Sequence, residues 1–422
     1  MQIEVTNRCN FKCQICMRQT WKAKPLDMSL DLYKKIAEES FSRLKRLVLY
    51  GVGEPFLNPN IVEMLRIARE KLPKESQIIM STNGSLISEQ LTDKIFKEIG
   101  VNSISFSIDT TDESTLRRIR RGFEPAAVTK SFWRIAKLKD KAAREFKLGV
   151  EAVIMEDNFK DLPNLVGNLA ENNIDYIIVS HVVPYTQETY EKALYTTLSR
   201  PSLEIIKSSL NFGWRLIRES SKELLGGIQG TEAHPKSAEL IREYWKHAEE
   251  RGYWINIPLL LKSRDKIKKT KMAESIFRLC QKIAQEHQVD LKLPRLYLNA
   301  KERKCPYIEK GTAVVRSDGQ VTPCLEFTYP HLLYINAHMK TVHEITFGET
   351  KREKIRDIWV KEAYANFRKT REKMVSNIPW CGDCPFSTLG CFYTKTNEAD
   401  CHANQPGCSE CLYSVNLVQC NI

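Results

Sequence analysis

The chain has 422 residues, of which 42% are hydrophobic and 27% charged, a composition typical of a globular protein long enough for two or three domains. Its longest apolar runs, such as "IPLLL" at 257–261, are too short to span a membrane, and no charged leader with an apolar core precedes the first motif, so we expect a cytoplasmic protein. The formal net charge of +12 indicates either solvated helix faces or a basic surface for an acidic partner. The sequence has no stripe of interleaved aromatic and basic residues, which argues against nucleic acid as that partner.

Six short runs rich in valine, isoleucine or phenylalanine recur before residue 190, with helical patterns between them. The runs are 2–6, 46–50, 77–81, 103–108, 148–155 and 176–179. The stretches between them carry apolar residues at i, i+3, i+4 and i+7, the period of an amphipathic helix. This alternation predicts parallel strands joined by right-handed crossovers. Residues 1–190 are therefore predicted to form an α/β fold, a partial (β/α)6 barrel of the TIM type with its active site at the carboxyl ends of the strands.

The pattern changes after residue 190 to long, charged, helix-like segments such as "SAELIREYWKHAEERG" at 237–252. Residues 191–299 are predicted to form a helical insert or linker that carries no readable motif. From residue 300 onward cysteines and turn residues dominate, and a small loop-rich segment with too little core is usually held together by metal. Residues 300–422 are therefore predicted to form a small cysteine-rich α+β domain.

The thirteen cysteines are distributed unevenly. Three lie in the first sixteen residues, Cys280 stands alone, and nine lie between Cys305 and Cys420. In a long cytosolic chain, clustered cysteines indicate metal ligands rather than disulfides, because the compartment keeps thiols reduced. An oxidised framework is the alternative. Cys280 lies in the apolar context "IFRLCQKIA" and is predicted to be a buried helix residue.

Cys9, Cys13 and Cys16 follow the first predicted strand with the spacing C-x3-C-x2-C. A [4Fe–4S] cluster is normally held by four thiolates, so three thiolates leave one iron with an open coordination position. The spacing allows one loop to wrap a single cubane. A partial zinc site, or an ordinary cluster with a distant fourth ligand, is the alternative.

This loop resembles the cysteine motif of the radical S-adenosylmethionine (radical SAM) family. The resemblance implies that the open iron binds the amino and carboxylate groups of S-adenosylmethionine, whose sulfonium is cleaved by one electron to release a 5′-deoxyadenosyl radical. It makes Cys9, Cys13 and Cys16 the catalytic residues as well as ligands of the first cluster. The residue before the third cysteine is usually aromatic in the family and is Ile15 here, a departure at an adenine contact.

Further motifs follow the second, third and fourth predicted strands. "YGVGEP" at 50–55 resembles the family's glycine–glycine–glutamate motif, in which a glycine permits close backbone approach and the glutamate binds the ligand's ammonium. "STNG" at 81–84 and "SFSID" at 105–109 offer groups for the ribose and methionyl parts. The cofactor-binding residues implied by the resemblance are Gly53, Glu54, Ser81, Asn83, Ser107, Asp109 and Arg121. A surface turn at Glu54 and an Asx-type turn after the fourth strand are the alternatives.

The late cysteines resemble the SPASM extension of many radical SAM maturases, which holds two auxiliary iron–sulfur clusters. "CGDCPFSTLGC" at 381–391 is close to that family's C-x2-C-x5-C, but Lys395 stands where a fourth cysteine is expected. The metal ligands predicted here are Cys305, Cys324, Cys381, Cys384, Cys391, Cys401, Cys408, Cys411 and Cys420. This is one more than two four-thiolate clusters need, and the sequence leaves their assignment open. A zinc ribbon is the alternative.

The resemblance predicts a radical SAM/SPASM maturase that modifies a peptide, protein or cofactor precursor. Its cofactors would be S-adenosylmethionine, one SAM-binding [4Fe–4S] cluster and two auxiliary clusters, and its partner an electron donor such as ferredoxin or flavodoxin. The segments 16–29 and 400–420 resemble maturases associated with tungsten-dependent aldehyde ferredoxin oxidoreductases. Thioether or carbon–carbon crosslinking of a peptide, and haem or quinone cofactor biosynthesis, are alternatives. A non-catalytic zinc or iron–sulfur binding module is the alternative of a different class.

Overall fold

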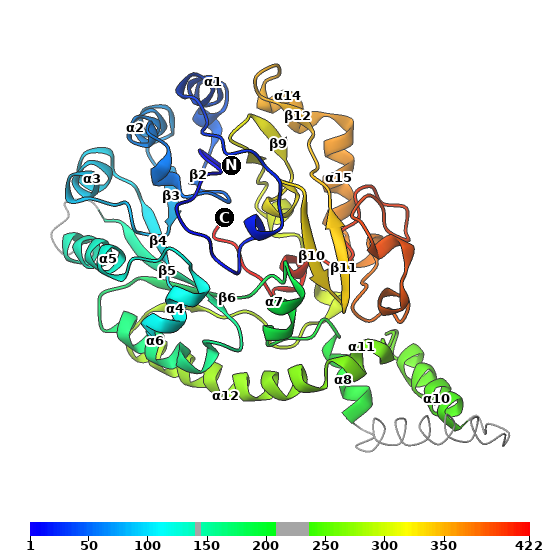
Figure 1. Ribbon diagram of the computed structural model, residues 1–422. Coiled ribbons are helices and arrows are strands. Elements are labelled where there is room, and N and C mark those ends of the chain that lie inside the picture. The colour runs from blue at the N-terminus through cyan, green and yellow to red at the C-terminus, as the bar shows by residue number, and fades with distance from the viewer. Residues whose placement is uncertain (140–144, 208–235) are drawn as a thin grey trace.

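The protein is represented by a computed structural model that describes residues 1–139, 145–207 and 236–422. Parallel strands curve around a central space, and helices form an outer arc (Figure 1). The six strands predicted from the sequence are present in chain order: β1 (Gln2–Ile3), β2 (Arg46–Leu49), β3 (Gln77–Thr82), β4 (Ser103–Ser107), β5 (Lys147–Ile154) and β6 (Tyr176–His181). Each pairs in parallel with the next, which confirms the α/β class and the partial barrel.

Helices cover the outside of the barrel because each has one apolar face. The Ser29 side chain caps α1 by accepting a hydrogen bond from the Leu32 backbone N–H, and α1 buries Tyr33 and Ile36 against the sheet. The helices that follow strands β1 to β6 are α1 (Leu30–Ser40), α2 (Ile61–Lys71), α3 (Glu89–Asp93), α4 (Glu113–Ile119), α5 (Pro125–Lys139), α6 (Leu162–Ala170) and α7 (Gln187–Lys192).

The sheet continues beyond the six predicted strands. β7 (Asp290–Lys292) pairs with β6, and β8 (Val314–Val315) pairs with β1, both in parallel. β9 (Gln320–Thr322) and β12 (Gly348–Glu349) extend the edge in antiparallel fashion, which gives a ten-stranded sheet. The segments predicted as insert and cysteine-rich domain therefore each contribute to the barrel sheet. The sequence did not predict these strands, because runs of two or three residues are too short to show an alternating pattern.

The segment between β6 and β7 is helical where the structure describes it. Its helices are α8 (Arg200–Lys207), α10 (Lys236–Glu250), α11 (Ile257–Lys262) and α12 (Arg264–Glu286). Residues 208–235, the middle of the predicted helical insert, lie outside the described residues. α12 packs along α6, and Cys280 is fully buried in it, as the sequence predicted. None of the described helices has the length and apolar character needed to cross a bilayer.

The last part of the chain packs beside the barrel (Figure 1). It contains a separate antiparallel hairpin of β10 (His331–Ile335) and β11 (His338–Val342). Its helices are α13 (Pro306–Glu309), α14 (Ile355–Val360), α15 (Glu362–Glu372) and α16 (Met374–Asn377). Most of the remaining backbone is loop and single turns, the loop-rich character expected from its composition.

The C-terminal tail, residues 416–422, enters the barrel between its strands (Figure 1). The His181 backbone N–H at the end of β6 donates to the Leu417 carbonyl at 3.1 Å. Across the barrel, the Arg46 guanidinium at the start of β2 donates to the Ile422 carbonyl at 2.9 Å. The tail therefore crosses from β6 to β2 and closes part of the barrel interior, where Ile422 is buried.

Candidate functional site

The three early cysteines lie in the loop that follows β1, at the edge where the carboxyl ends of the parallel strands meet. All three thiols are half-buried. Burial, together with the neighbouring Cys16 and Cys9 thiols, raises the pKa of Cys13 to about 12, so the three sulfur atoms share one environment. The loop is held to the end of α4, since the Lys12 and Gln14 backbone N–H groups donate to the carbonyls of residues 121 and 119 at 2.7 and 2.8 Å.

Gly53 packs directly against the backbone at the start of the cysteine loop. A Cβ atom at this position would come within 2.3 Å of the Thr6 carbonyl oxygen and 2.6 Å of the Arg8 carbonyl oxygen. The next backbone N–H, that of Glu54, donates to the same Arg8 carbonyl at 2.7 Å. Only glycine permits this approach, which brings the chain after β2 into direct contact with the cysteine loop.

Glu54 is 2% exposed, and its carboxylate joins the ends of two strands. It accepts hydrogen bonds from the Thr82 hydroxyl at 2.8 Å and from the Asn83 backbone N–H at 2.7 Å, both at the end of β3. Burial outweighs these hydrogen bonds and raises the pKa of Glu54 to about 7. The carboxyl is therefore poised to ionise when a cationic group binds beside it.

Asn83 connects this carboxylate to the cysteine loop. Its side-chain amide donates to the Asn10 side-chain oxygen at 2.9 Å and lies 3.9 Å from the Cys9 sulfur. Gly53, Glu54 and Asn83, three of the residues predicted from the sequence, are thus brought together at the mouth of the barrel with Cys9.

Ser81 and Ser107 lie on the inner side of the barrel and are half-buried. Ser81 hydrogen-bonds to Glu151, a β5 carboxylate that the sequence did not single out. Glu151 also accepts from the Ser105 hydroxyl at 2.5 Å and from the Asn421 amide at 3.2 Å, and burial raises its pKa. The signal for Glu151 is present in the sequence, because it is a lone acidic residue in the otherwise apolar run "LGVEAVI".

Asp109 does not offer a free carboxylate at the end of β4. The Arg120 guanidinium donates to both of its oxygens, at 2.7 and 2.8 Å, and the Val153 backbone N–H donates to one of them at 2.9 Å. Asp109 therefore holds Arg120 in a fixed orientation in which Arg120 also hydrogen-bonds to the Cys13 thiol.

Arg121 adjoins the cysteine loop through its backbone, since its carbonyl accepts from the Lys12 N–H at 2.7 Å, whereas its side chain is exposed. Its neighbour Arg120 is 9% exposed and faces the cysteine loop. Arg120 is the C-cap residue of α4, and its backbone N–H donates to the carbonyl of the buried Leu116.

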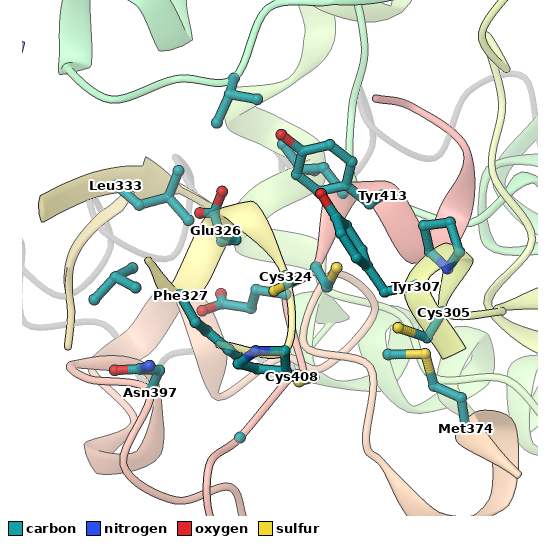
Figure 2. A pocket seen from close by; sticks show the side chains of 18 of the residues that line it. Cys305, Tyr307, Cys324, Glu326, Phe327, Leu333, Met374, Asn397, Cys408 and Tyr413 are labelled. Atoms are coloured by element: carbon teal, nitrogen blue, oxygen red, sulfur yellow. The ribbon is translucent and has the colours of Figure 1, made fainter. Parts of the chain in front are cut away.

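Four of the late cysteines surround one mostly apolar cavity. Cys305, Cys324, Cys408 and Cys411 line it together with Tyr307, Glu326, Phe327 and Tyr413, as Figure 2 shows for the labelled residues. Burial raises the pKa of Cys324, and the other three thiols raise it further, so all four lie close together. We call these four cysteines the inner group.

Four further cysteines form a second cluster nearer the surface. Burial raises the pKa of Cys401, and the Cys384 and Cys391 thiols contribute to the same shift. The Cys384 thiol likewise acts on the pKa of the buried Cys381. We call Cys381, Cys384, Cys391 and Cys401 the outer group, because Cys401 is exposed and so is Phe392, the residue after Cys391.

Cys420 is not among the residues that line the cavity of the inner group, although it packs against the same cluster around Tyr307 as Cys305 and Cys324. Tyr307 and Tyr413 hydrogen-bond to the Cys420 thiol, the former at 4.0 Å. Burial and the nearby Glu151 carboxylate raise the pKa of Cys420 to about 12. The nine late cysteines therefore divide into four, four and one. No three histidine, cysteine or carboxylate side chains of the described residues meet closely enough to hold a single metal ion, so assignment of metal to these groups is a proposal.

Two family models match the chain. Residues 3–140 match the radical SAM superfamily, and residues 305–385 match SPASM, described as an iron–sulfur cluster-binding domain. The first range contains the early cysteines with Glu54, Asn83 and Arg120, and the second contains part of each late group. These matches confirm the resemblance predicted from the sequence and identify iron–sulfur clusters and S-adenosylmethionine as its cofactors.

One curated relative is similar over the whole chain. It is the tungsten-containing aldehyde ferredoxin oxidoreductase cofactor-modifying protein of Pyrococcus furiosus, 27% identical, with 100% of this chain and 97% of that protein covered. The Fe-coproporphyrin III synthase of Methanosarcina barkeri is 28% identical but covers 42% of this chain and 43% of its own length. A GTP 3′,8-cyclase of Clostridium perfringens is also 28% identical, over 42% of this chain and 53% of its own length.

Solved structures support the fold. Streptococcus suis SuiB bound to S-adenosylmethionine superposes with a TM-score of 0.52 at 14% identity, covering 87% of this chain and 67% of that one. Native anSMEcpe with bound AdoMet has a TM-score of 0.50 at 13% identity, covering 99% of this chain and 92% of that one. At these identities the likeness concerns the arrangement of the barrel and the late domain.

Gly53→Ala is expected to displace the cysteine loop. The added methyl group would overlap two backbone carbonyl oxygens that cannot move independently, and overpacking of this kind costs about 1–3 kcal/mol of stability. We expect lower iron content at the first site after anaerobic reconstitution and a lower free energy of unfolding in denaturant titrations. Gly167→Ala is the matched control, because a Cβ atom at that position in α6 would have no other atom within 4 Å. Equal behaviour of the two variants would contradict the close packing at Gly53.

Proposed function

Because residues 3–140 belong to the radical SAM superfamily and residues 305–385 to the SPASM family, we propose that this protein is a maturase that cleaves S-adenosylmethionine reductively and modifies a peptide, protein or cofactor precursor. The observation that carries the proposal is the meeting of the Cys9, Cys13 and Cys16 loop with the Glu54 carboxylate through Asn83 at the carboxyl ends of the strands. A catalytic site in this position is the rule for barrels of this type.

The three early thiolates hold the first [4Fe–4S] cluster, which when bound supplies the electron for cleavage of the sulfonium. Glu54 binds the ammonium of S-adenosylmethionine, and Asn83 keeps Glu54 in register with the cysteine loop. Arg120 takes the place that the sequence assigned to Arg121. Its guanidinium, oriented by Asp109, offers positive charge beside Cys13. Ser81 and Ser107 face the barrel interior, where the ribose and the substrate would lie.

The inner and outer groups each hold one auxiliary cluster. The donor sets fit, since each contains four thiols in one environment, and the matching family is described by its iron–sulfur clusters. In this proposal residues 1–190 form the radical SAM core, 191–299 the insert and 300–422 the auxiliary cluster domain, although β7 and β8 join the barrel sheet. Cys420 is left without a cluster and faces the barrel interior.

We infer that the substrate belongs to the maturation of a tungsten-dependent aldehyde ferredoxin oxidoreductase. The similarity to the Pyrococcus furiosus protein runs through the insert and the late cysteines, the parts that lie outside the radical SAM range. The similarity to the haem-pathway synthase covers less than half of the chain. Peptide modification is a second candidate, favoured by the likeness in fold to SuiB bound to its precursor peptide SuiA, with a TM-score of 0.50.

An acidic redox protein such as a ferredoxin or flavodoxin would supply the electron in the cytoplasm, consistent with the chain's net charge of +12. Co-expression of a tungsten-dependent oxidoreductase with and without this protein tests the substrate assignment. Equal cofactor content and activity in both preparations would reject it and leave peptide modification.

Replacing Cys9, Cys13 and Cys16 together with alanine is expected to abolish formation of 5′-deoxyadenosine by the reconstituted, reduced protein, because no thiolate remains to hold the first cluster. Liquid chromatography of the products measures this, and iron analysis should show that about eight of roughly twelve irons are retained. Undiminished 5′-deoxyadenosine formation by the triple variant would contradict the proposed reaction.

Glu54→Gln is expected to weaken binding of S-adenosylmethionine by about 1.5–3 kcal/mol, the worth of a hydrogen bond to a charged group. The raised pKa, about 7, means that the wild-type carboxyl ionises for the ligand only as pH rises. Affinity measured by calorimetry should therefore increase between pH 6 and pH 8 in the wild type and stay flat in the variant. Glu70→Gln, at an exposed surface position, is the control.

The same pKa predicts the stability of the protein without ligand. Because the folded state binds the Glu54 proton more tightly than the unfolded state, the free energy of unfolding should fall as pH rises from 4.5 to about 7. Glu54→Gln should remove this part of the slope in denaturant titrations. A slope that is the same in both proteins would show that Glu54 keeps an ordinary pKa.

Cys420→Ala is expected to retain about twelve irons per chain after reconstitution, whereas Cys411→Ala should lose roughly four. The reason is that Cys411 belongs to the inner group, and Cys420 instead contacts two tyrosines and Glu151. Loss of four irons in the Cys420→Ala protein would show that Cys420 is a cluster ligand, as predicted from the sequence. About four irons with stoichiometric zinc in the wild type would reject auxiliary iron–sulfur clusters.

A further inference from the structure

A buried lysine lies between the inner and outer cysteine groups. β10 and β11 are joined by the two-residue turn Asn336–Ala337, in which both residues have positive φ angles, of 51° and 61°. Turns of this kind match the twist of the strands and set their register. Alternation along β11 then turns His338, Lys340 and Val342 inward, whereas Met339 is exposed. A lysine thus occupies an inward position where an apolar residue is expected.

Lys340 pairs with a carboxylate from the inner C-x2-C motif. Its ammonium lies 3.0 Å from Glu410, which is located between Cys408 and Cys411 in the sequence. The Asn336 side-chain amide donates to the other Glu410 oxygen at 2.6 Å, and the His338 ring nitrogen lies 3.2 Å from that oxygen. Lys340 is 5% exposed and Glu410 3%, so this is a fully enclosed ion pair.

The pair is shared by both cysteine groups. Lys340 and Glu410 line the same cavity as the inner group. Burial lowers the pKa of Lys340, but the Glu410 carboxylate and the thiols of Cys381 and Cys408 raise it above its ordinary value. Cys381 belongs to the outer group and Cys408 to the inner group. The geometry agrees, because the Cys381 backbone N–H donates at 3.0 Å to the carbonyl of Ser409, the residue before the Glu410 that pairs with Lys340.

Stability alone does not account for such a pair. Taking both charges out of water costs as much as their attraction returns, and apolar residues of the same volume would often stabilise the fold at least as well. The environment of a four-thiolate cluster makes a different use of the charge. Such clusters are anionic and gain further negative charge on reduction, so a nearby cation favours the reduced form, and local charge is one of the determinants of the potential.

We propose that Lys340 is a positioning residue whose charge raises the reduction potentials of the clusters held by both the inner and the outer group, and that Glu410 limits this effect. Asn336 and His338 keep the carboxylate beside the ammonium, so the hairpin turn sets the balance of charge. The proposal rests on the proposed function of the late cysteines as ligands of two auxiliary clusters.

The test is a redox titration of the full-length, anaerobically reconstituted protein followed by electron paramagnetic resonance. Lys340→Met should lower the midpoint potentials of both auxiliary clusters, and Glu410→Gln should raise them, because it leaves the lysine charge uncompensated. Lys340→Arg keeps the charge and should restore values close to those of the wild type. The potential of the first cluster and the rate of 5′-deoxyadenosine formation without substrate should stay unchanged in all three variants.

Lys266→Met is the matched control. Lys266 in α12 is also a buried lysine, 7% exposed. Its ammonium lies 3.8 Å from the centre of the Tyr190 ring. No cysteine is among the groups that shift its pKa. Its replacement should leave both auxiliary potentials unchanged. A shift as large as that of Lys340→Met would show that replacing any buried lysine has the same effect and would overturn the proposal.

The two opposite variants separate electrostatics from folding. Shifts of the same sign in Lys340→Met and Glu410→Gln, or no shift in either at full iron content, would overturn the role of Lys340. If the Lys340→Met protein fails to load iron, the other two variants test the role of Lys340. The proposal then requires higher auxiliary potentials in Glu410→Gln and potentials close to the wild type in Lys340→Arg. A wild-type protein without iron at the late cysteines would instead overturn the proposed function, a result that iron analysis registers before any titration.

Discussion

The buried Glu54 carboxylate is the interaction on which the arrangement of the site depends. It is anchored by the end of β3, through Thr82 and Asn83, while its own backbone N–H holds the start of the cysteine loop. Burying a carboxyl without such partners would cost several kcal/mol. Hydrogen bonds from the Thr82 hydroxyl and from the Asn83 and Phe56 backbone N–H groups offset that cost only in part, which is why the pKa of Glu54 stays raised. The carboxyl can therefore accept one more donor, which in the proposed function is the ammonium of S-adenosylmethionine.

The same principle recurs deeper in the barrel. Glu4 at the end of β1 accepts from the Val52 backbone N–H and from the Tyr329 hydroxyl, and Glu151 accepts from Ser105 and Asn421. Each of these carboxyls is buried and has a raised pKa. Their partners come from distant segments, so the polar interior ties the late domain and the tail to the barrel. Among the residues whose burial the structure describes, the buried lysines and arginines are Arg120, Lys266, Arg303, Lys340 and Arg371.

The late domain is coupled to the barrel through the C-terminal tail. The tail runs from β6 to β2 and carries Cys420 into the space between Tyr307, Tyr413 and Glu151. The inner group, with Tyr307 and Tyr413 in its cavity, is therefore adjacent to the barrel interior, and the outer group lies farther out near exposed aromatic residues. Lys340 and Glu410 occupy the position between the two groups.

The sequence by itself determined what depends on local pattern. Strand and helix periods predicted the six parallel strands in order, and the C-x3-C-x2-C spacing placed Cys9, Cys13 and Cys16 in one loop, because both are set by residues a few positions apart. The burial of Arg120 against Asp109, next to the exposed Arg121, could not be read from the run of arginines at 117–121. Only the tertiary structure decided the addition of β7 and β8, the division of nine cysteines into four, four and one, and the pairing of Lys340 with Glu410. The strand pairing of β8 with β1 and the pairing of Lys340 with Glu410 join residues separated by 70 to more than 300 positions, and the path of the chain that brings them together is set by packing of the whole core rather than by any local sequence.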